Sequence, residues 1–191
     1  MMLRRKTIFI IGTTLFGLLL ILYLIARLIL MDSFVSLEQD QVRQDVDRTL
    51  KAIETDLTNL NATAGDWAHW DDTLAFVKGT NDSYVTANLT DEAFVNLNLN
   101  FMLFSDTAGQ TVFGKWVDLQ SEAEVPFPNS LRREATPSSI LLQYSALDSS
   151  ASGIVLLPEC PLLVASQSIL TSSGEGPVGG ALMIGRCLDA P

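Results

Sequence analysis

A short block of aromatic and acidic residues holds the side chains most able to do chemistry: Trp67, His69, Trp70, Asp71 and Asp72. His69 is the sole histidine of the chain, so a metal site would have to be built from carboxylates alone. Asp71 and Asp72 are adjacent, and neighbours on a helix point about 100° apart, which does not make an acid–base pair. The sequence has no glycine-rich phosphate loop, Gly-x-Ser-x-Gly or His-Glu-x-x-His motif. These residues therefore predict neither an enzyme nor a cofactor or metal site.

The same block could line a ligand pocket, which needs an apolar wall and a few oriented polar groups. Six residues are candidates, Trp67, Trp70 and Tyr84 for the wall and Asp71, Asp72 and Asn88 for the polar groups. Carboxylates on an acidic domain favour a cationic or polyhydroxyl ligand over an anion. The alternative is structural. The two tryptophans, three residues apart and hence on one helix face, would be buried, and Asp71 or Asp72 would hold backbone amides.

Composition excludes several classes of partner. The 191 residues, 48% of them hydrophobic, suffice for one membrane segment and one domain. The net charge is −10, but Arg4, Arg5, Lys6 and Arg27 are the only charges among the first 31 residues. The remaining residues carry eight basic and twenty-two acidic side chains, a net charge of −14. Nucleic acid is excluded as a partner, because phosphate binding needs a cationic surface.

The N-terminal region predicts a membrane anchor. Residues 7–26 contain no charge, and at ~1.5 Å per residue they span the ~30 Å core of a bilayer. A cleaved signal peptide has a shorter apolar run of about 7 to 15 residues, so an uncleaved helix is favoured. We expect a cytoplasmic basic tail at 1–6, a transmembrane helix at 7–31 and an exported domain at 32–191, because basic residues stay inside. We therefore expect a single-pass protein of the inner (cell) membrane whose N-terminus is cytoplasmic and whose main domain is periplasmic or otherwise extracytoplasmic.

A long helix is expected to continue out of the membrane over residues 32–64, because the first glycine beyond the anchor is Gly65 and the first proline is Pro126. Apolar residues form one stripe along it: Val42, Val46, Thr49, Ile53, Leu57, Leu60 and Ala64. Two interpretations stay open. The stripe forms a homodimer seam, or its distal half packs against its own domain.

The rest of the chain predicts an α+β fold with a five-stranded antiparallel sheet and helices on one face. The expected strands are 98–105, 111–117, 153–157, 162–170 and 178–187, the last three forming a meander. Residues 119–138 are expected to be a surface loop around a short helix, and 140–147 another helix. A hairpin about the turn at 172–177 would place Cys160 opposite Cys187, close enough for a disulfide in an oxidising compartment.

Several motifs follow one another along the chain: the Trp-x-x-Trp-Asp-Asp block within 66–72, Tyr84-x-x-x-Asn88-Leu89, Asp106-x-x-Gly109, the run 163–166, and Gly179-Gly180 leading to Gly185-Arg186. Together they resemble the fourth family of CHASE domains. The similarity covers residues 32–189, and its most specific element is the tryptophan–aspartate block.

The resemblance implies a Cache-like or PAS-like extracellular ligand-sensing module of bacterial and archaeal histidine kinases or cyclic-di-GMP enzymes. Such modules lie between two transmembrane helices, ahead of an output domain, and bind a small molecule or a periplasmic protein on the helix-covered face of the sheet. This sequence stops at Pro191 without a second anchor or an output domain, which predicts a fragment of a receptor or a stand-alone module. The alternative is a membrane-tethered structural or protein-binding module with no signalling output.

Overall fold

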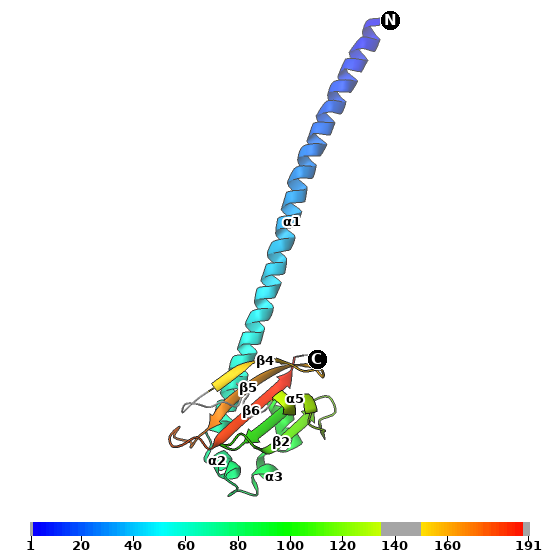
Figure 1. The fold of residues 1–191 in the computed structure, drawn as a ribbon. Coiled ribbons are helices and arrows are strands. Elements are labelled where there is room, and N and C mark those ends of the chain that lie inside the picture. Colours follow the sequence, from blue (N-terminus) through cyan, green and yellow to red (C-terminus); the bar gives the residue numbers. More distant parts are fainter. Residues whose placement is uncertain (1, 135–149, 189–191) are drawn as a thin grey trace. The chain divides into compact units, whose positions relative to one another are not determined.

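The computed structural model describes residues 2–134 and 150–188 and divides the chain into two compact units, residues 1–52 and 53–191. Helix α1 (Met2–Ala68) makes up the described part of the first unit and opens the second (Figure 1).

The first unit contains a helical stretch, Lys6–Arg27, that is long and apolar enough to cross a membrane. At ~1.5 Å per residue its 22 residues extend for about 33 Å, slightly more than the hydrocarbon core of a bilayer. Thr13 lies within it and donates from its hydroxyl to the carbonyl of Phe9 at 2.9 Å. The hydroxyl of Thr14 makes the same contact one residue further on. These side chains are thereby satisfied within the helix, as a hydrocarbon environment requires.

Helix α1 continues past its predicted end at residue 64 and stops at Ala68. The prediction took Gly65 as the break, but Ala64 and Ala68 on either side of it are fully buried. The carbonyl of Gly65 accepts a hydrogen bond from the backbone N–H of His69 at 2.9 Å. Packing of these small residues against the domain offsets the ~1 kcal/mol intrinsic cost of a glycine in a helix.

The apolar stripe of α1 changes its surroundings along the helix. Val42 and Val46 are 57% and 51% exposed, whereas Leu60 and Ala64 are buried in the core of the second unit. Ile53 packs partly on that core. The distal half of the stripe therefore packs against its own domain, and the part before Ile53 lies exposed.

Three short helices follow: α2 (Asp71–Val77), α3 (Tyr84–Asn88) and α4 (Asp91–Leu97). The hydroxyl of Thr90 caps α4 by accepting from the N–H of Ala93 at 3.3 Å. Asn98 caps the C-terminus of α4 with a left-handed φ of 54°, a conformation that asparagine tolerates better than most residues.

The predicted α+β class is confirmed, but the antiparallel sheet has six strands. They are β1 (Phe101–Ser105), β2 (Thr111–Asp118), β3 (Ala123–Val125), β4 (Ser150–Leu156), β5 (Pro161–Ile169) and β6 (Gly180–Cys187), in the order β3-β2-β1-β6-β5-β4. The predicted meander is present as β4-β5-β6. Strand β3 falls in the segment expected to be a loop. The sequence did not predict this strand, because three residues are too few to show an alternating pattern. Helix α5 (Asn129–Glu134) is the short helix expected there, and the helix predicted at 140–147 lies outside the described residues.

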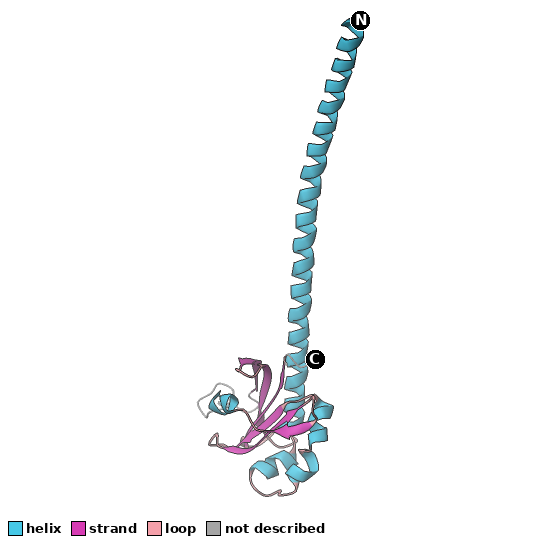
Figure 2. Ribbon diagram, turned by 90° about the vertical axis from the view of Figure 1, so that its right-hand side faces the viewer, coloured by secondary structure: helices cyan, strands magenta, loops and turns pink. Residues whose placement is uncertain are grey.

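Helices lie on both faces of the sheet, whereas the prediction placed them on one (Figure 2). Residues 53–68 of α1 and helices α2 to α4 form one core with Met102 and Phe104. Leu131 of α5 packs on the opposite face with Phe101 and Leu103. Alternate residues of β1 thus supply the two cores, as the two-residue period of a strand dictates.

Strands β5 and β6 pair two residues away from the predicted register. Leu162 faces Cys187, where the sequence suggested Cys160. The register differs because β6 begins at Gly180, which pairs with Ile169, rather than two residues earlier. Cys160 precedes β5 and reaches Cys187 diagonally, and the two form a disulfide with a Cα–Cα distance of 5.8 Å.

Candidate functional site

Of the two tryptophans of the predicted site, one lies in a helix and the other lies in the link to the next helix. Trp67 lies in the last turn of α1, and Trp70 is the extended residue that precedes α2, with φ −124° and ψ 129°. The expectation that they share one helix face is wrong, because α1 ends between them at Ala68. Their rings still meet edge to face with centroids 6.1 Å apart. Trp67 packs partly on the core, and Trp70 is 36% exposed.

Tyr84 lies in the core beneath these tryptophans and is fully buried. Its ring stacks on Phe76 at 4.6 Å, and its hydroxyl shares a 2.7 Å hydrogen bond with the buried hydroxyl of Thr73. Burial raises the pKa of Tyr84 from 10.0 to about 12; the Thr73 hydrogen bond opposes this shift and the charge of Asp72 adds to it. Tyr84 therefore holds the helices together rather than facing solvent.

The polar members of the predicted site are arranged differently from one another. Asp71 accepts the backbone N–H of Ser172 at 3.0 Å, and the Ser172 hydroxyl accepts the N–H of Asp71 at 3.1 Å. Asp71 thus holds a backbone amide, the structural role considered for it. Asp72 is exposed, and Asn88 is the half-buried last residue of α3. The block joins α2 to the β5–β6 connection, and the cavities described next are lined by other residues.

The last residues of β6 are fixed by Asn100, a buried residue that the sequence analysis did not single out. Its backbone N–H donates to the carbonyl of Gly185 at 2.9 Å, and its side-chain oxygen accepts the N–H of Cys187 at 2.8 Å. Its side-chain N–H donates to the carbonyl of Val117 at 3.1 Å. Together with the disulfide at Cys187, these bonds tie the end of β6 to β1 and β2. The sequence feature that could have indicated Asn100 is its position as a polar residue directly before an apolar strand.

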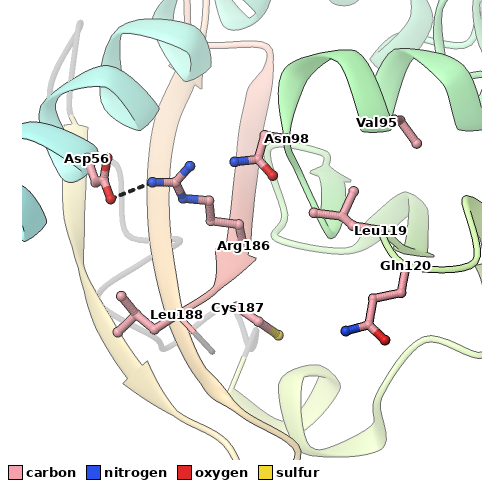
Figure 3. Close-up of a pocket in the computed structure, with 8 residues that line it drawn as sticks. All are labelled: Asp56, Val95, Asn98, Leu119, Gln120, Arg186, Cys187 and Leu188. Carbon is pink, nitrogen blue, oxygen red and sulfur yellow. Dashed lines mark ion pairs between the residues drawn. The ribbon is translucent and has the colours of Figure 1, made fainter. Parts of the chain in front are cut away.

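A cavity of about 430 Å³ lies beside this fixed end of β6 (Figure 3). Its lining comes from α1, from α4 and the residue after it, from the loop after β2, and from β6 and the residue after it: Asp56, Val95, Asn98, Leu119, Gln120, Arg186, Cys187 and Leu188. The volume falls within the ~300 to 1,000 Å³ range of small-molecule sites.

Arg186 and Asp56 form an ion pair at this cavity, with Nη2 of the arginine 2.5 Å from a carboxylate oxygen. The two side chains are 25% and 40% exposed. Figure 3 shows the guanidinium between Asp56 on α1 and the amide of Asn98. The pair is a direct polar link between α1 and the last strand of the sheet.

A second hollow of about 400 Å³ shares Leu119, Gln120 and Cys187 with the first. It is lined in addition by the buried Trp116 and by Asp118. The backbone N–H of Gln120 and the hydroxyl of Ser121 donate to Asp118 at 3.0 and 2.9 Å, and these bonds lower the pKa of its carboxyl group. These hydrogen bonds shape the loop that lines both hollows.

Sequence reasoning missed the pair at the first cavity. The sequence places Arg186 in the Gly185-Arg186 motif without a role, and it places Asp56 on the long helix outside the apolar stripe. A signal was present, because Arg186 is the only basic residue after Arg133 and lies in an otherwise apolar strand. An isolated cation in such a strand needs an acidic partner, but the sequence does not indicate which acid is that partner.

Comparisons with known proteins agree with this architecture. The CHASE4 domain model matches residues 52–191. The methanogenesis regulatory histidine kinase FilI of Methanothrix harundinacea is 36% identical to the chain over 177 residues. That match covers 91% of the chain but 20% of the relative, so the chain spans about a fifth of the length of this curated protein.

Among solved structures, the fold is similar to the extracellular domain of a protein described as a histidine kinase, vpHK1S-Z8. The TM-score is 0.53 with 13% identity, over 75% of this chain and 55% of that one. At this identity the likeness concerns the fold alone.

Proposed function

Because the chain belongs to the CHASE4 domain family, we propose that it is the extracytoplasmic sensor domain of a membrane-anchored receptor of the histidine kinase type. One observation carries the proposal: the family match over residues 52–191 coincides with the compact unit 53–191. The match to the histidine kinase relative covers 91% of the chain and so extends into the first unit as well. The kinase relative favours this output over a cyclic-di-GMP enzyme.

Two independent features support an exported domain. Arg4, Arg5 and Lys6 precede the apolar helical stretch, and basic residues of this kind stay in the cytoplasm. The disulfide between Cys160 and Cys187 belongs to an oxidising compartment such as the periplasm or the cell exterior.

Orientation is tested with reporter fusions after Leu188. Alkaline phosphatase, which needs an oxidising compartment, is expected to be active there, and a cytoplasmic fluorescent reporter at the same junction inactive. The matched control places both reporters after Lys6, where the activities are expected to be reversed. Activity of only the cytoplasmic reporter after Leu188 would contradict an exported domain.

The receptor is proposed to act as a homodimer. Val42, Val46 and Leu50 follow one another at four-residue intervals and are 57, 51 and 53% exposed, so they present a stripe that a second copy would cover. Confinement to a membrane raises the effective concentration of that copy. Val46→Cys is expected to cross-link in membranes, whereas Gln44→Cys, on the opposite face of the helix, is expected to remain monomeric. Equal cross-linking from both positions would remove the seam.

A further inference from the structure

We infer that the cavity between α1, α4 and the end of β6 is a binding site for a small zwitterion, with its carboxylate on Arg186 and its ammonium group on Asp56. The inference rests on the proposed sensor function and names the ligand class of that sensor. The predicted aromatic block is less suited to this role, because Tyr84 is buried and Asp71 is engaged with Ser172.

The side chains around the cavity match a zwitterion in charge and in polarity. They supply one cation, one anion and the two neutral amides of Asn98 and Gln120. Apolar surface comes from Val95, Leu119 and Leu188. A volume of about 430 Å³ admits a molecule with the two charged groups and a modest side chain.

Arg186 keeps hydrogen-bonding capacity for such a ligand. A guanidinium has five N–H donors, and the partner that the described residues provide is Asp56, through Nη2. The other half-buried cation of the domain, Lys115, differs in this respect. Its ammonium group donates to the carbonyl of Leu89 at 2.9 Å and forms ion pairs with Asp91 at 2.6 Å and Glu124 at 3.7 Å. Lys115 is thus engaged on all sides, whereas the fork of Arg186 can take a carboxylate beside its first partner.

Ligands with a single charge fit less well. A free anion on Arg186 would set a second negative charge beside Asp56 without a cation to match it. A free cation on Asp56 would likewise set a second positive charge beside Arg186. A zwitterion supplies both charges, so that each charged group of the site and of the ligand has an opposite charge next to it.

The part of the site that lies on β6 is preorganised. Cys187 and Gly185 are fixed by Asn100, and the disulfide adds a covalent link next to Arg186. Preorganised groups bind more tightly because less ordering is required on binding. Asp56 instead belongs to α1, three residues after the start of the compact unit. A ligand inserted between the two charges would therefore change the contact of α1 with a rigid strand end.

The test uses the full chain in lipid nanodiscs and the common α-amino acids as probes, supplied one at a time. At about a hundredfold excess over Kd, at least one is expected to raise Tm by about 5 to 10 °C. The carboxylate-only and amine-only analogues of the active probe, such as propionate and ethylamine for alanine, are expected to leave Tm unchanged.

Variants assign the response to the cavity. Arg186→Gln and Asp56→Asn are each expected to weaken binding of the active amino acid by about 30-fold or more in calorimetry, the cost of truncating one partner of a charged contact. Asn98→Gly keeps the left-handed backbone and removes the amide, for an expected loss of about five- to tenfold. Arg48→Gln is the matched control, because that arginine is paired with Asp45 outside the cavity, and its affinity should equal that of the wild type.

Two results would overturn the inference. If no amino acid shifts Tm, neither the site nor the ligand class stands. If an amino acid binds to Arg186→Gln and to Asn98→Gly as tightly as to the wild type, the ligand lies elsewhere, while the sensor function stands. Should Arg186→Gln fail to fold, the affinity of Asn98→Gly alone decides whether the ligand lies in this cavity or elsewhere. The sensor function itself is judged separately, by the reporter fusions above.

Discussion

Replacing Tyr84 with phenylalanine tests whether the aromatic block is core. The ring of Tyr84 stacks on Phe76 and meets Phe104 edge to face, and phenylalanine keeps both contacts. The substitution removes only the hydroxyl that shares a 2.7 Å hydrogen bond with Thr73. Because Thr73 is fully buried, its hydroxyl is then left without that partner.

The expected cost is about 1 to 3 kcal/mol of unfolding free energy, the usual penalty for an unsatisfied buried hydroxyl. The double substitution Thr73→Val with Tyr84→Phe removes both polar groups and keeps their shape, so it should recover most of this loss. The two single changes are therefore expected to be strongly non-additive, as for residues in direct contact.

The same tyrosine predicts a loss of stability at high pH. Its pKa rises from 10.0 to about 12 on folding, so between these values the unfolded chain has released a proton that the folded chain keeps. The unfolded state binds fewer protons there, and the unfolding free energy falls as pH rises. Two pKa units correspond to about 3 kcal/mol, present in full below pH 10 and lost by about pH 12. Tyr84→Phe should lack this contribution.

Both effects are measured by guanidinium denaturation of the full chain in detergent, followed by tryptophan fluorescence at neutral pH and at steps between pH 10 and 12. A Tyr84→Phe variant as stable as the wild type at neutral pH, with the same alkaline slope, would refute the buried hydrogen bond. It would also reopen the block as a ligand pocket.

Three further substitutions test the surrounding fold. Asp71→Ala should lower the unfolding free energy by about 1 kcal/mol through loss of the Ser172 amide, while Asp72→Ala should stay within about 0.5 kcal/mol in the same denaturation assay; equal losses would contradict the assignment. Cys160→Ser should cost about 3.5 kcal/mol, the loop entropy for a separation of 27 residues, and an unchanged midpoint would mean that the bond does not stabilise the fold. Gly180→Ala should cost about 2 kcal/mol or more, because the φ of Gly180 is +153° and an added Cβ would overlap the carbonyl oxygen of Ser105. Gly153→Ala is the control and should be tolerated, because a Cβ added there meets open space. Similar stability of the two variants would refute the close approach at Gly180.

The α+β class, five of the six strands and the meander followed from alternation and turn residues, because these signals are local. Strand β3 did not, since its three residues form a strand only through pairing with Trp116–Asp118. The end of α1 was misplaced for a related reason. Burial of Ala64 and Ala68 outweighs the helix-breaking tendency of Gly65, and burial depends on the rest of the domain.

The candidate site was harder to predict because it depends on long-range pairing. The aromatic cluster was recognised from its composition, but its division between α1 and α2 depends on where α1 ends. Asp56 and Arg186 lie 130 residues apart, and nothing local to either indicates that the fold brings them together. The β5–β6 register shows the same limit, since a shift of two residues keeps every side chain on its predicted face.

The central claim, that this domain senses for a kinase, is tested most directly in a chimera. The chain replaces the matching segment of the Methanothrix harundinacea histidine kinase, and autophosphorylation is measured in liposomes. Arg186→Asp sets two acids side by side and is expected to change the autophosphorylation rate by about fivefold or more. Adding Asp56→Arg to this variant restores the ion pair in reverse and is expected to restore the rate. The same rate in the chimera, both variants and a version without residues 53–188 would contradict a sensory role for the domain.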